Sequence, residues 1–309
     1  MFVMSTIVIH DQWMELRQLR YVVSVAETGH FTRAAERCHV VQSALSHQIA
    51  KLERELGARL FDRTRRQVRL TPAGEAFVPA ARQALDAAAR ARAEVAAVTG
   101  EVRGRLALGA IGTVTAVDLA ALLADFHARY PDVRIALRSG ASLELIAEVR
   151  AGGLDAAFLG VPSGFRPTGV RHRRLAVGEL VAVLGPAHPL AGRPVAALRD
   201  LAAEAFVDFP AGSAARAQSD EAFAAAGIDR DVAFEVSSVE FLGQLVGTGL
   251  GVGLVPADFA TQLSGVRVLP LSDAPARVEH LVWGQGPASP ATAAFLTVLD
   301  SHHREARAR

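Results

Sequence analysis

The strongest constraint on the fold is a run of short helical segments joined by tight turns within residues 14–57. The first segment has apolar residues at helical spacing and ends at Gly29. The second is predicted to begin with Thr32 as its N-terminal cap, and its small pair Ala34-Ala35 allows another helix to approach closely. A third segment follows almost at once, so this stretch predicts a small three-helix module.

The third segment, which begins near Gln42 and ends at Gly57, has one apolar and one polar face. Its buried stripe, at steps of four, three and four, is Leu45, Ile49, Leu52 and Leu56. Short polar side chains lie opposite, ahead of Lys51: Gln42, Ser43, Ser46 and His47. Such groups can touch base edges when the first turns of a helix enter the major groove. The pattern fits a helix-turn-helix and, equally, an ordinary solvated helix face.

Charge supports the first interpretation. Residues 14–72 carry eleven basic and six acidic residues, a net charge of +5, which leaves −4 elsewhere because the whole chain is +1. A small basic module beside an acidic body indicates contact with a polyanion. Within it, residues 59–72 predict a β-hairpin wing whose arginines can reach phosphates, and Thr71-Pro72 then begins a new helix.

One long helix is predicted over residues 73–101, which are rich in Ala, Arg and Glu. A small module is too short to cover such a helix, so we expect it to pair with its copy from a second chain. The alternative is a helical spacer without self-association.

Strands and helices alternate after Val102, which predicts parallel sheet in two α/β lobes. The expected strands are 105–109, 133–137, 155–160, 180–184, 205–209, 232–236, 252–255 and 278–283. The expected helices are 113–130, 142–151, 213–226, 238–248 and a last one from Ser289 onward. Two such lobes in series suit a hinged body with a cleft.

Residues 15–74 resemble the winged helix-turn-helix of LysR-type transcriptional regulators, in both the order and the spacing of their motifs. The matching motifs are Glu15-Leu16-Arg17-Gln18-Leu19-Arg20-Tyr21, Gly29-His30-Phe31-Thr32-Arg33-Ala34-Ala35, Gln42-Ser43-Ala44-Leu45-Ser46-His47-Gln48-Ile49, Leu52-Glu53-Arg54-Glu55-Leu56-Gly57, Leu60-Phe61-Asp62-Arg63 and Leu70-Thr71-Pro72-Ala73-Gly74. Family members usually begin at the position of Met14, so residues 1–13 are either a misassigned start or a disordered tail.

The resemblance implies a role for each matching residue of this module. The residues that would contact bases are Gln42, Ser43, Ser46 and His47, and Ala44 would make an apolar contact to a thymine methyl. Phosphate contacts fall to Thr32, Arg33, Arg63, Arg65 and Arg66, whereas Lys51 is either a phosphate contact or plain surface charge.

The resemblance also implies the domain order and overall fold, an α/β chain. A winged helix-turn-helix (14–72) is followed by a linker and dimerisation helix (73–101) and by an effector-binding domain (102–309) similar to periplasmic solute-binding proteins. Lobe I is expected to comprise 102–173 and 267–309, and lobe II 174–266, with crossovers near Arg174 and Val266. Partners would be double-stranded DNA, a small-molecule effector and a second copy, as dimer or tetramer.

Ligands of such folds bind at the carboxyl ends of strands, where helix N-termini offer free backbone N–H groups. The candidate effector contacts at these turns are Gly112, Thr113, Ser142, Gly160, Val161, Pro210, Ala211, Ser213 and Ser238. Each Ser or Thr could instead be a simple N-cap. Arg216 is the nearest basic candidate, so helix dipoles would carry any preference for an anion.

Other function classes fit the sequence less well. No G-x-S-x-G elbow is present, and the glycines of 247–253 follow a predicted helix and lack the spacing of a dinucleotide site. We expect no cofactor and no metal, since His302-His303 lacks partner ligands and Cys38 is the single cysteine. No apolar run is long enough to cross a bilayer and no secretory signal is evident, so a cytoplasmic, non-enzymatic protein is expected. The alternative class is a small-molecule-binding protein or enzyme whose N-terminal module serves only assembly.

Overall fold

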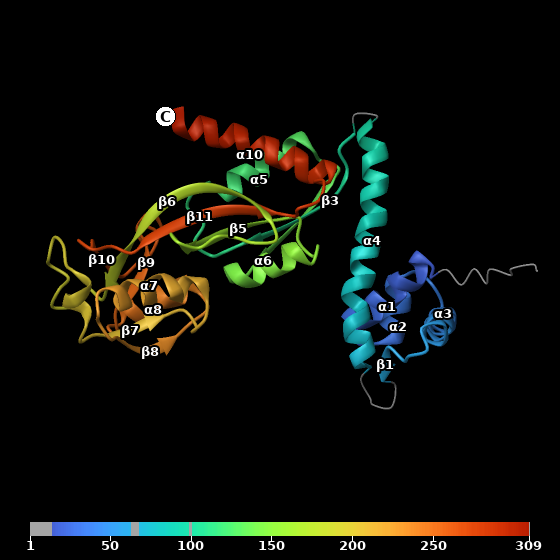
Figure 1. Cartoon of the computed structure of the whole chain (residues 1–309), viewed down its shortest axis with the longest axis horizontal. Helices are drawn as coiled ribbons and strands as arrows, with labels where there is room; N and C mark the ends of the chain where they lie inside the picture. The colour runs from blue at the N-terminus through green and yellow to red at the C-terminus, as the bar shows by residue number, and fades with distance from the viewer. Residues whose placement is uncertain (1–13, 63–67, 99–100, 309) are drawn as a thin grey trace, which may run out of the picture. The chain divides into compact units, whose positions relative to one another are not determined.

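The computed structural model describes residues 14–62, 68–98 and 101–308 and divides into two units, Met1–Arg92 and Ala93–Arg309 (Figure 1). Among the described residues no helix is long and apolar enough to cross a membrane.

The first unit is a three-helix module with a two-stranded wing. Its elements are α1 (Leu16–Thr28), α2 (Phe31–Arg37), α3 (Gln42–Glu55), β1 (Phe61–Asp62), β2 (Arg69–Leu70) and most of α4 (Pro72–Val98), whose last residues belong to the second unit. The apolar stripe of α3 packs against Val22, Val25 and Ala34, all fully buried. Gly29 ends α1 in the left-handed conformation with φ 62°, as the sequence predicts.

The N-terminal cap of α2 differs from the prediction. His30, not Thr32, is the capping residue, and its ring accepts a hydrogen bond from the Thr32 backbone N–H at 3.3 Å. Thr32 lies inside the helix, whereas His30 has the extended backbone that a cap requires. An imidazole nitrogen therefore takes the capping role that sequence reasoning assigned to a hydroxyl.

The wing is held to the helices by side-chain contacts to backbone. The Glu53 carboxylate accepts hydrogen bonds from the N–H groups of Leu60 and Phe61, at 2.8 and 3.2 Å. Thr71 donates to the Arg59 carbonyl at 2.5 Å and accepts from the Gly74 N–H at 3.1 Å, which caps α4 as predicted.

The second unit is built on one mixed sheet and a smaller one. Its strands are β3 (Gly104–Ala110), β4 (Val133–Ser139), β5 (Ala156–Pro162), β6 (Arg171–Leu184), β7 (Ala205–Asp208), β8 (Asp231–Glu235), β9 (Gly253–Pro256), β10 (Arg267–Leu269) and β11 (Ala276–Trp283). Its helices are α5 (Leu119–Arg129), α6 (Ser142–Arg150), η1 (Leu198–Leu201), α7 (Ala214–Ala225), α8 (Val239–Gly247), α9 (Ala257–Ala260) and α10 (Pro290–Ala308).

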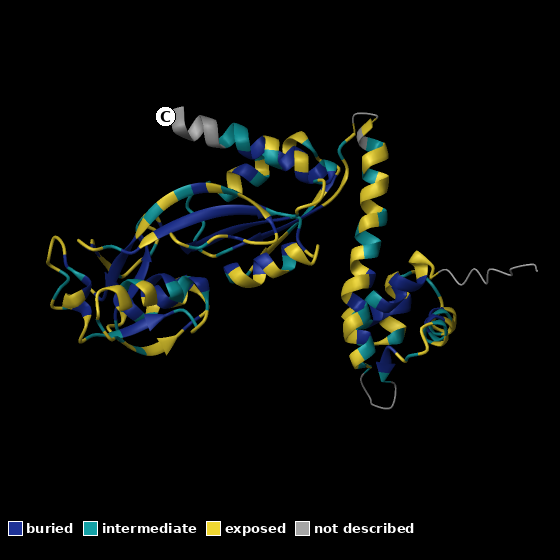
Figure 2. Cartoon of the chain, in the orientation of Figure 1, coloured by how far each residue is buried: buried dark blue, intermediate teal, exposed yellow. Residues whose placement is uncertain are grey.

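The sheets divide this unit into two lobes. Strands β4, β3 and β5 are parallel, as predicted, and β11 and β6 continue the same sheet in antiparallel pairing. The first part of β6 pairs with β11, and its end, from Leu180 to Leu184, pairs with β9 and β10. Strand β6 therefore runs from one lobe into the other, and β7 and β8 form a separate parallel pair in the second lobe. In Figure 2 the central strands are almost wholly buried.

Two sequence predictions are wrong in this unit. The helix expected from Thr113 begins only at Leu119, after an Asp118 cap that accepts from the Ala121 N–H at 3.0 Å. The strand expected at 180–184 starts nine residues earlier, at Arg171. In both cases pairing or contact with the distant strand β11 decides the local conformation.

Candidate functional site

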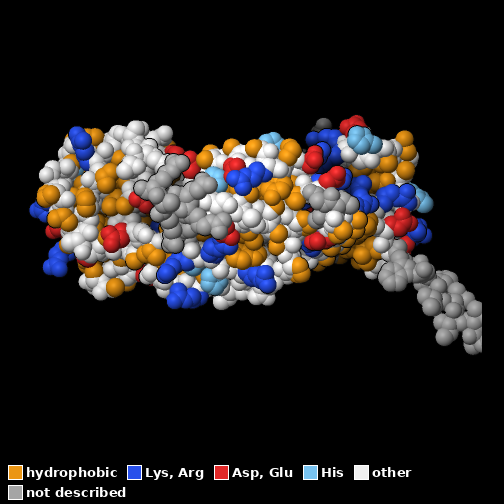
Figure 3. Space-filling view, turned by 90° about the horizontal axis from the view of Figure 1, so that it is seen from above, with side chains coloured by type: hydrophobic (Ala, Val, Ile, Leu, Met, Phe, Trp, Pro, Cys, Tyr) orange, Lys and Arg blue, Asp and Glu red, His pale blue; other side chains and the backbone are white. Residues whose placement is uncertain are grey.

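The polar face of α3 is exposed and its apolar face is buried. Leu45 and Ile49 have no exposed surface, whereas the opposite side chains reach solvent. The exposed predicted residues are Gln42, Ser43, Ala44, His47 and Lys51, with Thr32 and Arg33 exposed on α2, and Ser46 is half-buried. Arg63, Arg65 and Arg66 lie outside the described residues. The module thus presents short donors and acceptors at a helix N-terminus on a rigid core (Figure 3 shows side-chain types over one face of the molecule).

The second unit contains a cavity of about 660 Å³ between its lobes. Eight of the nine predicted effector residues line it: Gly112, Thr113, Ser142, Gly160, Pro210, Ala211, Ser213 and Ser238. The ninth, Val161, is fully buried in the core of the first lobe, because alternate residues of β5 face opposite sides of the sheet. A cavity of this volume suits a small metabolite.

The hydroxyl groups around the cavity have different roles. Ser213 and Ser238 are N-caps, accepting hydrogen bonds from the N–H groups of Arg216 and Phe241. Ser142 instead joins α6 to β5: its hydroxyl donates to the Gly160 carbonyl at 3.0 Å and accepts from the Gly160 N–H at 3.2 Å. Among the described residues, the Thr113 hydroxyl has no hydrogen-bond partner. Of these groups, Thr113 is the one left free for a ligand.

Arg277, on β11, is the basic residue of the cavity wall, among the described residues, that sequence reasoning missed. Its side chain is 4% exposed, and Nη2 donates to the Thr113 carbonyl at 2.8 Å and to Glu279 Oε1 at 3.2 Å. Burial lowers the pKa of the Arg277 guanidinium, against the opposing charge of Glu279. Gly160 makes room for this guanidinium, since a Cβ there would lie 2.6 Å from Nη2.

Glu279 fixes the loop that was predicted to be helical. Its carboxylate accepts from the Thr115 hydroxyl at 2.6 Å and from the N–H groups of Thr115 and Ala116 at 3.1 Å. Glu279 and Thr115 are 164 residues apart in the sequence, so no local pattern predicts their contact. The available signal was the alternation Arg277-Val278-Glu279 within an apolar strand, which places two charges on one face.

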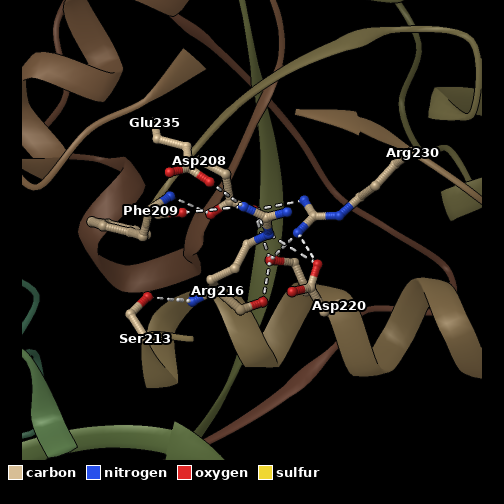
Figure 4. A network of polar contacts seen from close by, with 8 residues as sticks. Asp208, Phe209, Ser213, Arg216, Asp220, Arg230 and Glu235 are labelled. Atoms are coloured by element: carbon tan, nitrogen blue, oxygen red, sulfur yellow. Dashed lines mark hydrogen bonds and ion pairs between the residues drawn. The ribbon is translucent and has the colours of Figure 1, made fainter. Parts of the chain in front are cut away.

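Behind the cavity wall, a polar network centred on the buried pair Asp208 and Arg230 holds the loop between β7 and α7 (Figure 4). Asp208, 2% exposed, binds Arg230 Nη1 at 2.6 Å, and Arg230 also binds Asp220 at 2.6 Å. Arg216 donates to the Phe209 carbonyl at 3.4 Å, and the Phe209 N–H donates to Asp208 at 2.7 Å. Burial raises the pKa of the Asp208 carboxyl despite these partners. The network therefore holds both the N–H and the carbonyl of Phe209, the first residue of the loop that lines the cavity.

An exposed helix-turn-helix face and a ligand-sized cleft between two α/β lobes define a ligand-responsive DNA-binding regulator. Residues 16–75 match the model of the bacterial regulatory helix-turn-helix proteins of the lysR family, and residues 99–304 match the LysR substrate binding domain. The chain belongs to the LysR family of transcriptional regulators.

Relatives and solved structures agree with this assignment. The chain is 38% identical over 245 residues to the HTH-type transcriptional regulator ShiR of Corynebacterium glutamicum, covering 78% of this chain and 82% of that protein. A full-length OxyR variant from Pseudomonas aeruginosa is 29% identical, with TM-score 0.72 and coverage of 94% of this chain and 95% of that one. Full-length CbnR in complex with its target DNA is 26% identical, also with TM-score 0.72, covering 94% of this chain and 100% of that one.

Proposed function

We propose that this regulator reads promoter DNA with the N-terminal turns of α3 and that a small molecule in the cleft changes its DNA binding. The exposed polar face of α3 above a buried apolar stripe is the observation that carries the proposal. The structure of full-length CbnR with its target DNA supports it, because that structural relative is seen bound to DNA.

Base and phosphate contacts should respond differently to substitution. His47→Ala should reduce the ratio of operator to non-specific affinity by about 5- to 150-fold, because a base-edge contact contributes about 1–3 kcal/mol of discrimination. Arg33→Ala should weaken both affinities together and flatten the salt dependence by about one unit. Quantitative gel shifts on a selected operator and on scrambled DNA, at several salt concentrations, measure both effects.

His127→Ala is the matched control, since this exposed histidine lies on α5 in the other unit. The substitution should change neither the ratio of operator to non-specific affinity nor the salt dependence of binding. If His47→Ala lowers both affinities equally, α3 is not the element that reads the bases.

The effector side of the proposal rests on Thr113. Thr113→Val keeps the shape but removes a hydroxyl that has no partner among the described residues, so effector-free DNA binding should be unchanged. A lost hydrogen bond contributes about 1 kcal/mol, so about fivefold more effector should be needed to shift the DNA footprint. Footprinting across an effector titration measures this, with the effector taken from a thermal-shift screen.

Thr297→Val is the control, because the hydroxyl of this exposed residue of α10 only donates to the Ala293 carbonyl in its own helix. Its footprint should shift at the wild-type effector concentration. A Thr113→Val protein whose footprint shifts at the wild-type effector concentration would place the effector elsewhere. One that loses DNA binding altogether would show a structural role for Thr113.

We further propose a non-catalytic protein that self-associates and acts in the cytoplasm, where bacterial promoters lie. Among the described residues, no group of three or more His, Cys, Asp or Glu side chains could hold a metal ion. The proposed domains keep the boundaries expected from the sequence, 14–72, 73–101 and 102–309.

A further inference from the structure

The wall of the cleft contains a buried cation whose hydrogen-bonding capacity is only partly used. Both protein acceptors of Arg277, the Thr113 carbonyl and Glu279, bind the same nitrogen, Nη2. Its Nε is buried and has no hydrogen-bond partner among the described residues. A guanidinium carries five N–H donors in a planar fork. Two of them, on Nη2, are used and the one on Nε is buried, so the two on Nη1 are the donors left for an acceptor in the cleft.

Glu279 neutralises this cation incompletely. Its carboxylate is occupied by the backbone N–H groups and hydroxyl of the 115–116 loop, and it meets Arg277 through a single 3.2 Å contact. The two side chains therefore do not form a bidentate pair, the strong geometry for arginine and carboxylate. Gln218, 5% exposed and also in the cavity wall, has a buried amide oxygen without a partner in the described part of the chain, so a second polar group of this wall has unused hydrogen-bonding capacity.

The remaining charges of the cleft point to a ligand of low charge. Glu144 and Glu240 line the cavity as exposed side chains, each in the first turn of its helix, α6 or α8. They offset the positive ends of those two helix dipoles and repel a second anionic group. Helix α7, the third helix that begins at the cavity, has no acidic residue in its first turn. One anionic group is thus favoured near Arg277 and α7, and disfavoured near Glu144 and Glu240.

We propose that the effector is a small organic acid with a single carboxylate, which binds the free donors of Arg277. The rest of such a ligand is uncharged and lies among the hydroxyl and apolar side chains of the cleft. Dicarboxylates and phosphate esters are disfavoured, because two glutamates face a single cation among the described residues of the cavity wall. This inference rests on the proposed function, because it names the ligand class of the same cleft.

The test uses three matched sets of compounds with the full-length protein. The monocarboxylates are hexanoate, benzoate and cyclohexanecarboxylate; their amides are the uncharged matches; adipate, terephthalate and cyclohexane-1,4-dicarboxylate are the doubly charged matches, with inorganic phosphate added. Thermal shift identifies binders and calorimetry gives their affinities. We expect at least one monocarboxylate to bind, and its amide and dicarboxylate matches to bind at least about tenfold more weakly.

Variants assign the carboxylate to Arg277. Arg277→Gln should weaken monocarboxylate binding by about 10- to 100-fold, the usual effect of losing a charged hydrogen bond. Arg277→Lys should give an intermediate loss, because it keeps the charge but not the fork. Arg267→Gln, which removes an exposed arginine of β10 outside the cavity, should bind like the wild type. If Arg277→Gln fails to fold, Gly160→Ala displaces the guanidinium without removing it.

The outcomes separate this inference from the proposed function. The proposed ligand class is wrong if no monocarboxylate of the panel binds. It is also wrong if the amide binds as tightly as its monocarboxylate, or if the Arg277→Gln protein binds the monocarboxylate as tightly as the wild type does. If a compound of another class binds and Thr113→Val weakens it, the cleft remains the effector site and only the carboxylate is wrong. If binding of every compound is indifferent to Thr113→Val, Arg277→Gln and Gly160→Ala, the proposed cleft itself is wrong.

Discussion

Arg230→Ala is expected to lower the free energy of unfolding by about 3–5 kcal/mol, because it removes one partner of a buried ion pair. The Arg230 side chain is 5% exposed and lies 2.6 Å from Asp208, which is itself 2% exposed. The guanidinium also lies 5.2 Å from the ring centres of both Phe206 and Phe223. Its loss leaves a buried carboxylate and a gap between two aromatic rings. Urea denaturation followed by circular dichroism measures the change.

The pH dependence of this loss has a definite sign. Burial already raises the pKa of Asp208, and without Arg230 the pKa rises further. A group whose pKa is higher in the folded state stabilises the fold at low pH and loses that contribution as pH rises. The deficit of Arg230→Ala should therefore be smaller at pH 5 than at pH 8. An equal deficit at both values would mean that lost packing, not the unpaired carboxylate, causes the instability.

Arg193→Ala is the matched control. This arginine is 53% exposed and pairs with Asp200 at 3.6 Å, so its loss should change stability by less than about 1 kcal/mol. The variant pair Arg230→Met with Asp208→Asn should recover part of the stability, since it removes the uncompensated charge. No recovery in the pair would contradict the electrostatic explanation.

The same network affects ligand binding through the loop it holds. Asp208 and Arg216 fix the N–H and carbonyl of Phe209, which lines the cavity. Its members come from β7, α7, β8 and the segment before β8, which sequence patterns predict as separate elements. Nothing in their spacing shows that five charged side chains meet behind one turn, because sheet pairing and helix packing bring them together.

Local patterns predicted the framework of the molecule. Apolar periodicity identified α3 and its buried Leu45 and Ile49, and the turn glycine identified the end of α1 at Gly29. Alternation of elements predicted the parallel order around β3, whose neighbours are close in sequence. These features depend on residues that are near each other along the chain, so sequence reasoning reaches them.

Long-range contacts account for what sequence reasoning missed. Thr113 was expected to start a helix because it follows Gly112 after the first strand of lobe I, but Glu279 holds the segment after it as a loop. Arg277 lay just before the expected strand 278–283, and only the pairing of β11 beside β5 places it at Gly160. Sequence reasoning named Arg216 as the nearest basic candidate and left any preference for an anion to helix dipoles, but Arg216 belongs to the network behind the wall.

The long helix α4 is the basis of the second prediction, a loss of self-association and of operator affinity. Beyond Ala81, which is buried, most of the helix is exposed in Figure 2, including Val95 at 71% and Val98 at 89%. Small residues recur along it at positions that permit close helix approach: Ala80, Ala84, Ala88 and Ala91. We expect two copies to pair along this helix, which would place two DNA-reading modules on one operator.

Ala88→Pro should therefore abolish pairing and weaken operator binding by about 100- to 10,000-fold, the range of avidity lost when two linked modules act singly. Proline at this position removes the hydrogen bond to the carbonyl of Ala84 and clashes with it, at a cost of about 3 kcal/mol or more. The module that reads DNA should stay folded, because its core contacts with α4 involve Phe77 and Val78, upstream of the change. Light scattering measures the mass, and gel shift measures the affinity.

Ala89→Gln is the control, since it changes an exposed neighbour off the small-residue face and retains good helix propensity. Its mass and operator affinity should equal those of the wild type. A monomeric wild-type protein, or an Ala88→Pro protein that keeps the wild-type mass, would make α4 a spacer and not a pairing helix. A monomeric Ala88→Pro protein with undiminished operator affinity would show that one module suffices for recognition.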